Sequence, residues 1–151
     1  SATFPSSVAE FCNALDSRGI EYYFVYMAGL AGAGGGYRNA INSAKVFSQL
    51  NPYFIHVDAL TLFPETELYT LAKEGKYIPA GEKERLLEMQ TFIRNLQIRT
   101  HLFANTVSNF YPVSAYLPKE REKIVAELQQ VMDTFSEEEM QEYRSNLKSL
   151  G

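Results

Sequence analysis

A cluster of glycines between a strand pattern and a helix pattern is the feature that most restricts how this chain can fold. Five of its nine glycines lie between residues 29 and 36, directly after an aromatic and apolar run over residues 22–30. Glycine allows close backbone approach and positive φ, and α/β proteins commonly place a ligand where a strand ends in such a turn before a helix. The cluster therefore predicts a ligand site without naming the ligand.

The length and composition predict one globular domain with a sizeable core. The chain has 151 residues, of which 46% are hydrophobic, and no apolar run of about 18 residues could span a membrane. The first residues lack the basic region and the apolar core of a signal peptide. Because the sequence begins at Ser1 rather than Met, we expect a processed chain or a fragment.

The charge and the cysteine content exclude several classes of partner. The chain carries 14 basic and 18 acidic residues, for a formal charge of −4, whereas nucleic-acid binding needs concentrated Lys and Arg. We therefore expect neither nucleic acid nor a membrane as a partner. Cys12 is the sole cysteine, which favours a reducing, cytoplasmic setting and excludes a structural zinc or iron–sulfur site held by this chain alone.

The periodicity alternates between helix and strand as far as residue 104. Helices are predicted to begin at Ser7 (with Glu10 as a capping box), after the glycines, near Pro64, before Leu86, at Pro118 and at Ser136. Strands are predicted over residues 20–30, 53–63 and 98–104. This order predicts an α/β fold with about three parallel strands and right-handed crossovers, whose open edges invite pairing with another chain.

Known nucleotide-binding motifs do not match the glycine cluster. A Walker loop needs Gly-Lys-Ser/Thr, but Tyr37 and Arg38 follow the last glycine. The dinucleotide fingerprint would need a third glycine where Tyr37 stands. A flexible turn without a ligand, or a phosphate site of another kind, stays open as an alternative.

His56 and Asp58 are the strongest polar candidates outside the glycine cluster. They lie two residues apart on a predicted strand, so both point to one face, where they either contact a polar ligand or satisfy each other. His101 has a similar standing. The histidines lack metal-ligand spacing and no serine lies in a nucleophile elbow, so we predict no metal ligand and no catalytic residue. Tyr22, Phe24 and Tyr26 share a strand face and pack in the core or line a pocket.

A succession of short motifs resembles radical S-adenosylmethionine proteins. The motifs are GLAGAGG at residues 29–35, LNPYFI at 50–55, LTLFPETELY at 60–69, EGKYIP at 74–79, NTVSN at 105–109 and LPK at 117–119. The segment at 60–69 matches that family's strand-Pro-x-Thr-x-Leu pattern. The similarity spans about residues 8 to 130 and is greatest to the subgroup of oxygen-independent coproporphyrinogen oxidase-like and Fe–S oxidoreductase proteins.

The resemblance implies that residues 1–117 form the C-terminal half of a partial (β/α)6 TIM-like barrel and that residues 118–151 form a helical extension of the same domain. It implies contacts with the adenosyl part of S-adenosylmethionine from the ends of two strands. These contacts would come from Gly29, Leu30, Gly32, Leu60, Thr61, Leu62 and Phe63. The substrate-facing candidates would be His56, Asp58, His101, Asn105 and Asn109.

The chain departs from that family at the metal site. The Cys-x3-Cys-x2-Cys motif for the [4Fe–4S] cluster is absent, and Thr106 stands where the family pattern suggests His. The resemblance thus implies an inactive C-terminal fragment of a radical oxidoreductase, whose partners are the missing N-terminal half of the barrel and a small-molecule substrate. A homodimer through the open sheet edge is a further expectation. A non-enzymatic α/β interaction or ligand-binding module is the alternative.

Overall fold

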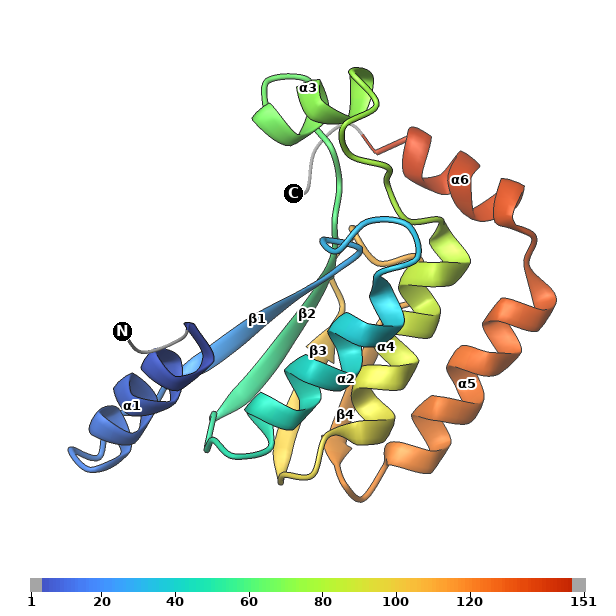
Figure 1. Cartoon of the computed structure of the whole chain (residues 1–151). Coiled ribbons are helices and arrows are strands. Elements are labelled where there is room, and N and C mark those ends of the chain that lie inside the picture. The colour runs from blue at the N-terminus through green and yellow to red at the C-terminus, as the bar shows by residue number, and fades with distance from the viewer. Residues whose placement is uncertain (1–3, 148–151) are drawn as a thin grey trace.

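The computed structural model describes residues 4–147, with side chains from residue 7 onward, as an open sheet with helices packed against one face (Figure 1). The strands are β1 (Tyr23–Ala28), β2 (Phe54–Ala59), β3 (Thr100–Ala104) and β4 (Val113–Leu117). The helices are α1 (Phe4–Asp16), α2 (Gly36–Phe47), α3 (Glu67–Lys73), α4 (Glu82–Asn95), α5 (Arg121–Thr134) and α6 (Glu137–Ser145).

The sheet has the strand order β1-β2-β3-β4 and is mixed. β1, β2 and β3 are parallel, which confirms the predicted α/β class and its three parallel strands. β4 pairs antiparallel with β3, with Thr100 opposite Leu117 and Ala104 opposite Val113. The segment between β3 and β4 contains no helix that could cross the sheet, so the chain returns antiparallel. The sheet is open rather than closed into a barrel.

The fourth strand is the main correction to the predicted fold. Val113, Ala115 and Leu117 are buried, while Ser114 and Tyr116 are exposed, which is the period-2 alternation of a strand with one covered face. The segment is only five residues long and stands directly before Pro118, where we expected a helix to begin. The helix instead starts at Arg121, after a cis Leu117–Pro118 peptide bond.

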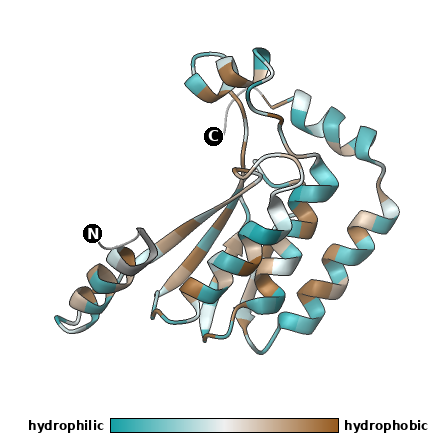
Figure 2. Cartoon of the chain, in the orientation of Figure 1, coloured by the Kyte–Doolittle hydropathy of each residue, from teal (hydrophilic) through white to brown (hydrophobic). Residues whose placement is uncertain are grey.

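The core lies between the sheet and the layer formed by α2, α4 and α5. The central helix α4 buries Leu86, Met89 and Ile93 as predicted, together with Phe92, against alternate residues of the strands. Phe92 stacks on Tyr26 of β1 at 4.2 Å between ring centroids, and Phe47 of α2 stacks on Phe24 at 4.5 Å. Tyr26 is therefore a core residue, whereas Phe24 is half-buried and lines a pocket beside α1. The residues of β1 are mainly hydrophobic, whereas those of α6 are mainly hydrophilic (Figure 2).

The other face of the sheet is uncovered within residues 4–147. Three side chains that point to this face keep large exposed fractions: Tyr23 (58%), Val25 (51%) and Tyr116 (60%). No helix of the described residues lies over it (Figure 1), and the outer edge of β1 has no strand partner there. Open-sheet exposure of this extent marks a surface suited to another chain or to a ligand.

Helix α1 lies beside β1 and differs from its predicted form. It begins at Phe4, three residues before the predicted cap Ser7. Cys12 is buried as expected, but Phe11 is 66% exposed because none of the described residues covers that side of the helix. The predicted capping box of Ser136 and Glu139 at the start of α6 is confirmed.

Candidate functional site

The carboxyl ends of the parallel strands bring three sequence-predicted segments to one edge of the sheet (Figure 1). Residues 29–32 follow β1, residues 60–63 follow β2 and residues 105–109 follow β3. The first two segments adjoin directly, since the Leu60 amide donates to the Ala28 carbonyl at 2.9 Å. This edge is where ligands bind in open α/β sheets.

The backbone of the glycine turn is satisfied by the protein itself. The amides of Gly29 and Gly34 donate to the carboxyl groups of Glu88 (2.8 Å) and Glu84 (2.7 Å). The amide of Gly32 donates to the Gly29 carbonyl at 3.1 Å. A phosphate needs free amide donors, and here side-chain oxygens already occupy two of them. The turn geometry therefore argues against a phosphate cradle.

Two glycines of this turn are required by close packing. Gly29 has φ +90°, and a Cβ there would lie 2.8 Å from Nε of Arg85. Gly32 has φ +74°, and a Cβ there would lie 2.9 Å from the Ile78 carbonyl oxygen. Both positions need glycine whether or not a ligand binds. Leu30, at the tip, is 55% exposed, and contact of Gly29, Leu30 and Gly32 with a cofactor stays a prediction.

Glu88 joins the glycine turn to the core. Its side chain is only 1% exposed, and it accepts hydrogen bonds from Gly29 N, from the Tyr26 hydroxyl (2.7 Å) and from Asn39 Nδ2 (2.9 Å). Burial, and then the bond to Glu88, raises the pKa of Tyr26. The three donors come from β1, the turn and α2, so Glu88 fixes these elements relative to α4.

A buried ion network holds the segment after β2. Arg144 of α6 pairs with Glu82 and donates to the Thr61 hydroxyl (2.7 Å) and the Ser108 carbonyl (2.7 Å). Arg85 also pairs with Glu82, at 2.6 Å. Burial lowers the pKa of Arg85, and its Nε is buried without a hydrogen-bond partner among the described residues.

A cavity of about 550 Å³ opens beside this network. Predicted cofactor residues Thr61, Leu62 and Phe63 line it together with Arg85 and Arg144. Leu62 and Phe63 are half-buried, so they offer apolar contact while keeping access to solvent. This cavity is a concave region at the carboxyl ends of the strands.

Glu137 of α6 caps the N-terminus of α4 from outside that helix. Gly81 at the N-cap has no side chain to accept the first amides, and Glu137 instead accepts from Glu82 N (2.6 Å) and Lys83 N (3.0 Å). Burial on its own would raise the pKa of Glu137, but the two amide bonds, together with a hydrogen bond from Gln141 and the charge of Arg85, outweigh burial and lower it. The predicted preference of acidic residues for the start of α6 is met as well.

His56 and Asp58 are brought together on the open face as predicted. His56 Nδ1 lies 3.5 Å from Asp58 Oδ2, and both side chains are about a quarter exposed. Asp58 accepts hydrogen bonds from the Thr106 hydroxyl (2.5 Å) and, more weakly, from Ser108 (3.4 Å). Thr106 therefore orients Asp58. The pair is anchored on one side and accessible on the other.

The remaining predicted substrate residues do not contact this pair directly, although Asn109 Nδ2 donates to the Thr106 hydroxyl at 3.3 Å. Asn109 is buried and donates to the Val57 carbonyl at 2.8 Å, which is a structural bond, although its Oδ1 lacks a partner among the described residues. Asn105 is exposed in the loop after β3. His101 lies on the same sheet face but stacks on Tyr116 at 4.0 Å and lies 3.1 Å from the Ser114 hydroxyl.

Four buried or mostly buried charged residues could not be recognised from the apolar stripe of α4 or from the capping box of α6: Glu82, Arg85, Glu88 and Arg144. Charged residues on a helix are usually exposed. One sequence feature does indicate two of them. Arg85 and Glu88 directly precede Leu86 and Met89, so the helical period places them next to the buried side of α4.

Within residues 4–147 no group of three or more His, Cys, Asp or Glu side chains could hold a metal ion. None of the helices in this range combines the length and the apolar character needed to cross a membrane. No protein-family profile, curated protein or solved structure matches the chain.

Replacing Glu88 with Gln tests its role in fixing the turn. The amide group turns one acceptor into a donor, which leaves a buried donor among Gly29 N, Tyr26 and Asn39 unsatisfied. We expect a loss of about 2 kcal/mol or more in unfolding free energy, measured by urea denaturation. The matched control is Glu84→Gln, which affects one bond at the exposed Gly34 and should cost less than about 1 kcal/mol. Equal losses would contradict this role.

Replacing Glu137 with Gln tests the external cap through its pH dependence. The native pKa of Glu137 lies below its unfolded value of 4.5, so its stabilisation is present above pH 4.5 and is lost as pH falls through the native pKa. We expect Glu137→Gln to lose about 1 kcal/mol at pH 7, with the gap to wild type closing at low pH. The exposed neighbour Glu138→Gln is the control, and a gap independent of pH would refute the cap.

Proposed function

We propose that this chain is the C-terminal part of a radical S-adenosylmethionine oxidoreductase and contributes one side of its barrel. The observation that carries the proposal is the one-sided sheet: three parallel strands with helices on one face only, and a second face left open within residues 4–147. In a (β/α) barrel the helices pack outside and the inner face points to the lumen. The order of sequence motifs over residues 29–119 adds support.

The described residues fit the [4Fe–4S] cluster and the S-adenosylmethionine of such an enzyme to different extents. The described residues include one thiol, Cys12, which is buried and whose pKa is raised by burial, so this chain does not provide a [4Fe–4S] site. The adenosyl group fits better, because Leu62 and Phe63 line the cavity of about 550 Å³ at the strand ends. When bound, S-adenosylmethionine supplies the radical chemistry.

The chain's own residues would position the ligands. Arg144 and Glu82 hold Thr61, and so set where Leu62 and Phe63 lie. His56 and Asp58, on the open face of the sheet, would present an imidazole to a substrate in the lumen, with Asp58 held by Thr106. The other half of the barrel would bring the iron–sulfur ligands, so we expect this chain to be inactive when isolated.

Titration with S-adenosylmethionine, followed by ¹H–¹⁵N NMR on the intact chain, tests this function. We expect resonances of residues 60–63 to shift, and Phe63→Ala to weaken binding about tenfold because base–aromatic contact is lost. Tyr37→Ala, at an exposed tyrosine on α2, is the matched control and should leave the affinity unchanged. Absence of shifts at 60–63, or equal binding by Phe63→Ala, would rule the proposal out.

A non-enzymatic interaction module is the second candidate, and the free edge of β1 favours it. Within residues 4–147 that edge has no partner strand, and Tyr23 and Val25 beside it are more than half exposed. An unprotected edge with apolar neighbours pairs readily with a second chain.

Sedimentation equilibrium distinguishes this candidate. An interaction module that pairs through β1 should form a dimer, and Val25→Lys should return it to a monomer because a charge at an edge strand opposes pairing. The control is Leu87→Lys on α4, at a side chain 44% exposed, which should leave the dimer intact. A monomeric wild-type chain that binds S-adenosylmethionine would favour the first candidate.

A further inference from the structure

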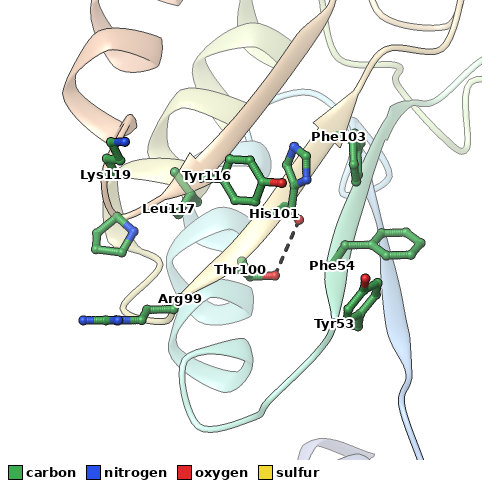
Figure 3. A pocket seen from close by; sticks show the side chains of 10 residues that line it. Tyr53, Phe54, Arg99, Thr100, His101, Phe103, Tyr116, Leu117 and Lys119 are labelled. Carbon is green, nitrogen blue, oxygen red and sulfur yellow. Dashed lines mark hydrogen bonds between the residues drawn. The ribbon is translucent and has the colours of Figure 1, made fainter.

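A second cavity lies on the open face of the sheet, near the amino ends of β2 and β3 and away from the glycine turn (Figure 3). Its volume is about 670 Å³. The aromatic rings of Tyr53, Phe54, His101 and Tyr116 form one side, and residues 117–119 and Arg99 form the other. Of the residues proposed above to contact an adenosyl group or a substrate, only His101 lines this second cavity.

The aromatic side of this cavity is a pre-packed stacking surface. Tyr116 lies against His101 at 4.0 Å with an interplanar angle of 25°, and His101 in turn lies 3.8 Å from Phe103. Phe54 packs edge-on to Phe103 at 5.6 Å. These contacts hold the ring of Tyr116, which stays 60% exposed, while Tyr53 beside them makes one edge-on contact with Phe54 at 6.1 Å and is 67% exposed. Rigid, exposed ring faces favour a planar aromatic ligand, since little side-chain entropy is lost on binding.

The charged side of the cavity is cationic and unpaired. Arg99 and Lys119 both line it and are exposed, and neither makes an ion pair with any residue of the described part of the chain. No acidic side chain lines the cavity. The nearby Glu120 accepts from the Tyr116 amide at 2.8 Å and so turns toward the backbone. This side of the cavity is therefore locally positive, although the chain has a net charge of −4.

We propose that this cavity binds a planar aromatic molecule that carries one phosphate or carboxylate group. The ring stacks on Tyr116 and Tyr53, and the anionic group lies at the rim between Arg99 and Lys119, whose long side chains reach it by rotation. Two cations in an acidic chain suit a single anionic group and disfavour a polyanion. The inference does not rest on the proposed function, because it concerns the opposite end of the strands.

Binding of 1-naphthyl phosphate to the intact chain tests the proposal, with 1-naphthoate, 1-naphthol and inorganic phosphate as comparison ligands. By ¹H–¹⁵N NMR titration, we expect the two aromatic anions to shift residues 53–54, 99–101 and 116–119. The relative affinity of 1-naphthyl phosphate and 1-naphthoate distinguishes phosphate from carboxylate preference. Naphthol and phosphate should each bind at least about fivefold more weakly, because each lacks one of the two interactions.

Matched variants locate the site. The double variant R99Q/K119Q should weaken 1-naphthyl phosphate about tenfold and leave naphthol unchanged, while Tyr116→Ala should weaken both. Tyr53→Ala repeats the ring test at a side chain that is 67% exposed, in case Tyr116→Ala unfolds. Arg38→Gln and Tyr37→Ala on α2 are the charge and ring controls.

Three results would overturn the proposal. The first is equal binding of 1-naphthol and 1-naphthyl phosphate, which would show a general apolar patch. The second is unchanged affinity in R99Q/K119Q. The third is a shift confined to residues 60–63, which would place the anion at the other end of the sheet and leave the proposed adenosyl site intact.

Discussion

The buried carboxyl group of Glu88 accepts hydrogen bonds from three separate parts of the chain: the Gly29 amide, the Tyr26 hydroxyl and the Asn39 side chain. A buried polar group is stable only when its bonds are made, so these three donors must converge on α4. That requirement sets where β1 ends, where the glycine turn passes over α4 and where α2 begins. The position of the turn at the sheet edge follows from this one side chain.

The same helix carries the second constraint, the pairing of Glu82 with Arg85 and Arg144. Breaking such a buried ion pair is costly, because the remaining charge has no partner. Arg144 therefore holds α6 against the loops after β2 and β3, through Thr61 and the Ser108 carbonyl. The C-terminal helix that we expected as a mere extension is part of the edge that shapes the cavity beside Leu62 and Phe63.

The one-sided sheet gives the molecule two surfaces of different character. The face toward α2, α4 and α5 is a packed aromatic and aliphatic core. The opposite face carries the polar pair His56 and Asp58 near the carboxyl ends and a ring cluster with unpaired cations near the amino ends. Near the amino ends the backbone pairing is continuous from β1 to β4, whereas the carboxyl end of β2 pairs with β1 and not with β3.

Sequence patterns by themselves determined the elements that depend on local periodicity: three strands, the apolar stripe of α4, the Ser136 capping box and the shared face of His56 and Asp58. They also located the glycine turn, because positive φ limits Gly29 and Gly32 to glycine. Only the tertiary structure decided β4, whose short alternation becomes a strand by pairing with β3. It also decided that the turn amides meet Glu84 and Glu88 across fifty residues of separation or more, since hydrogen bonds between distant residues leave no periodic trace in the sequence.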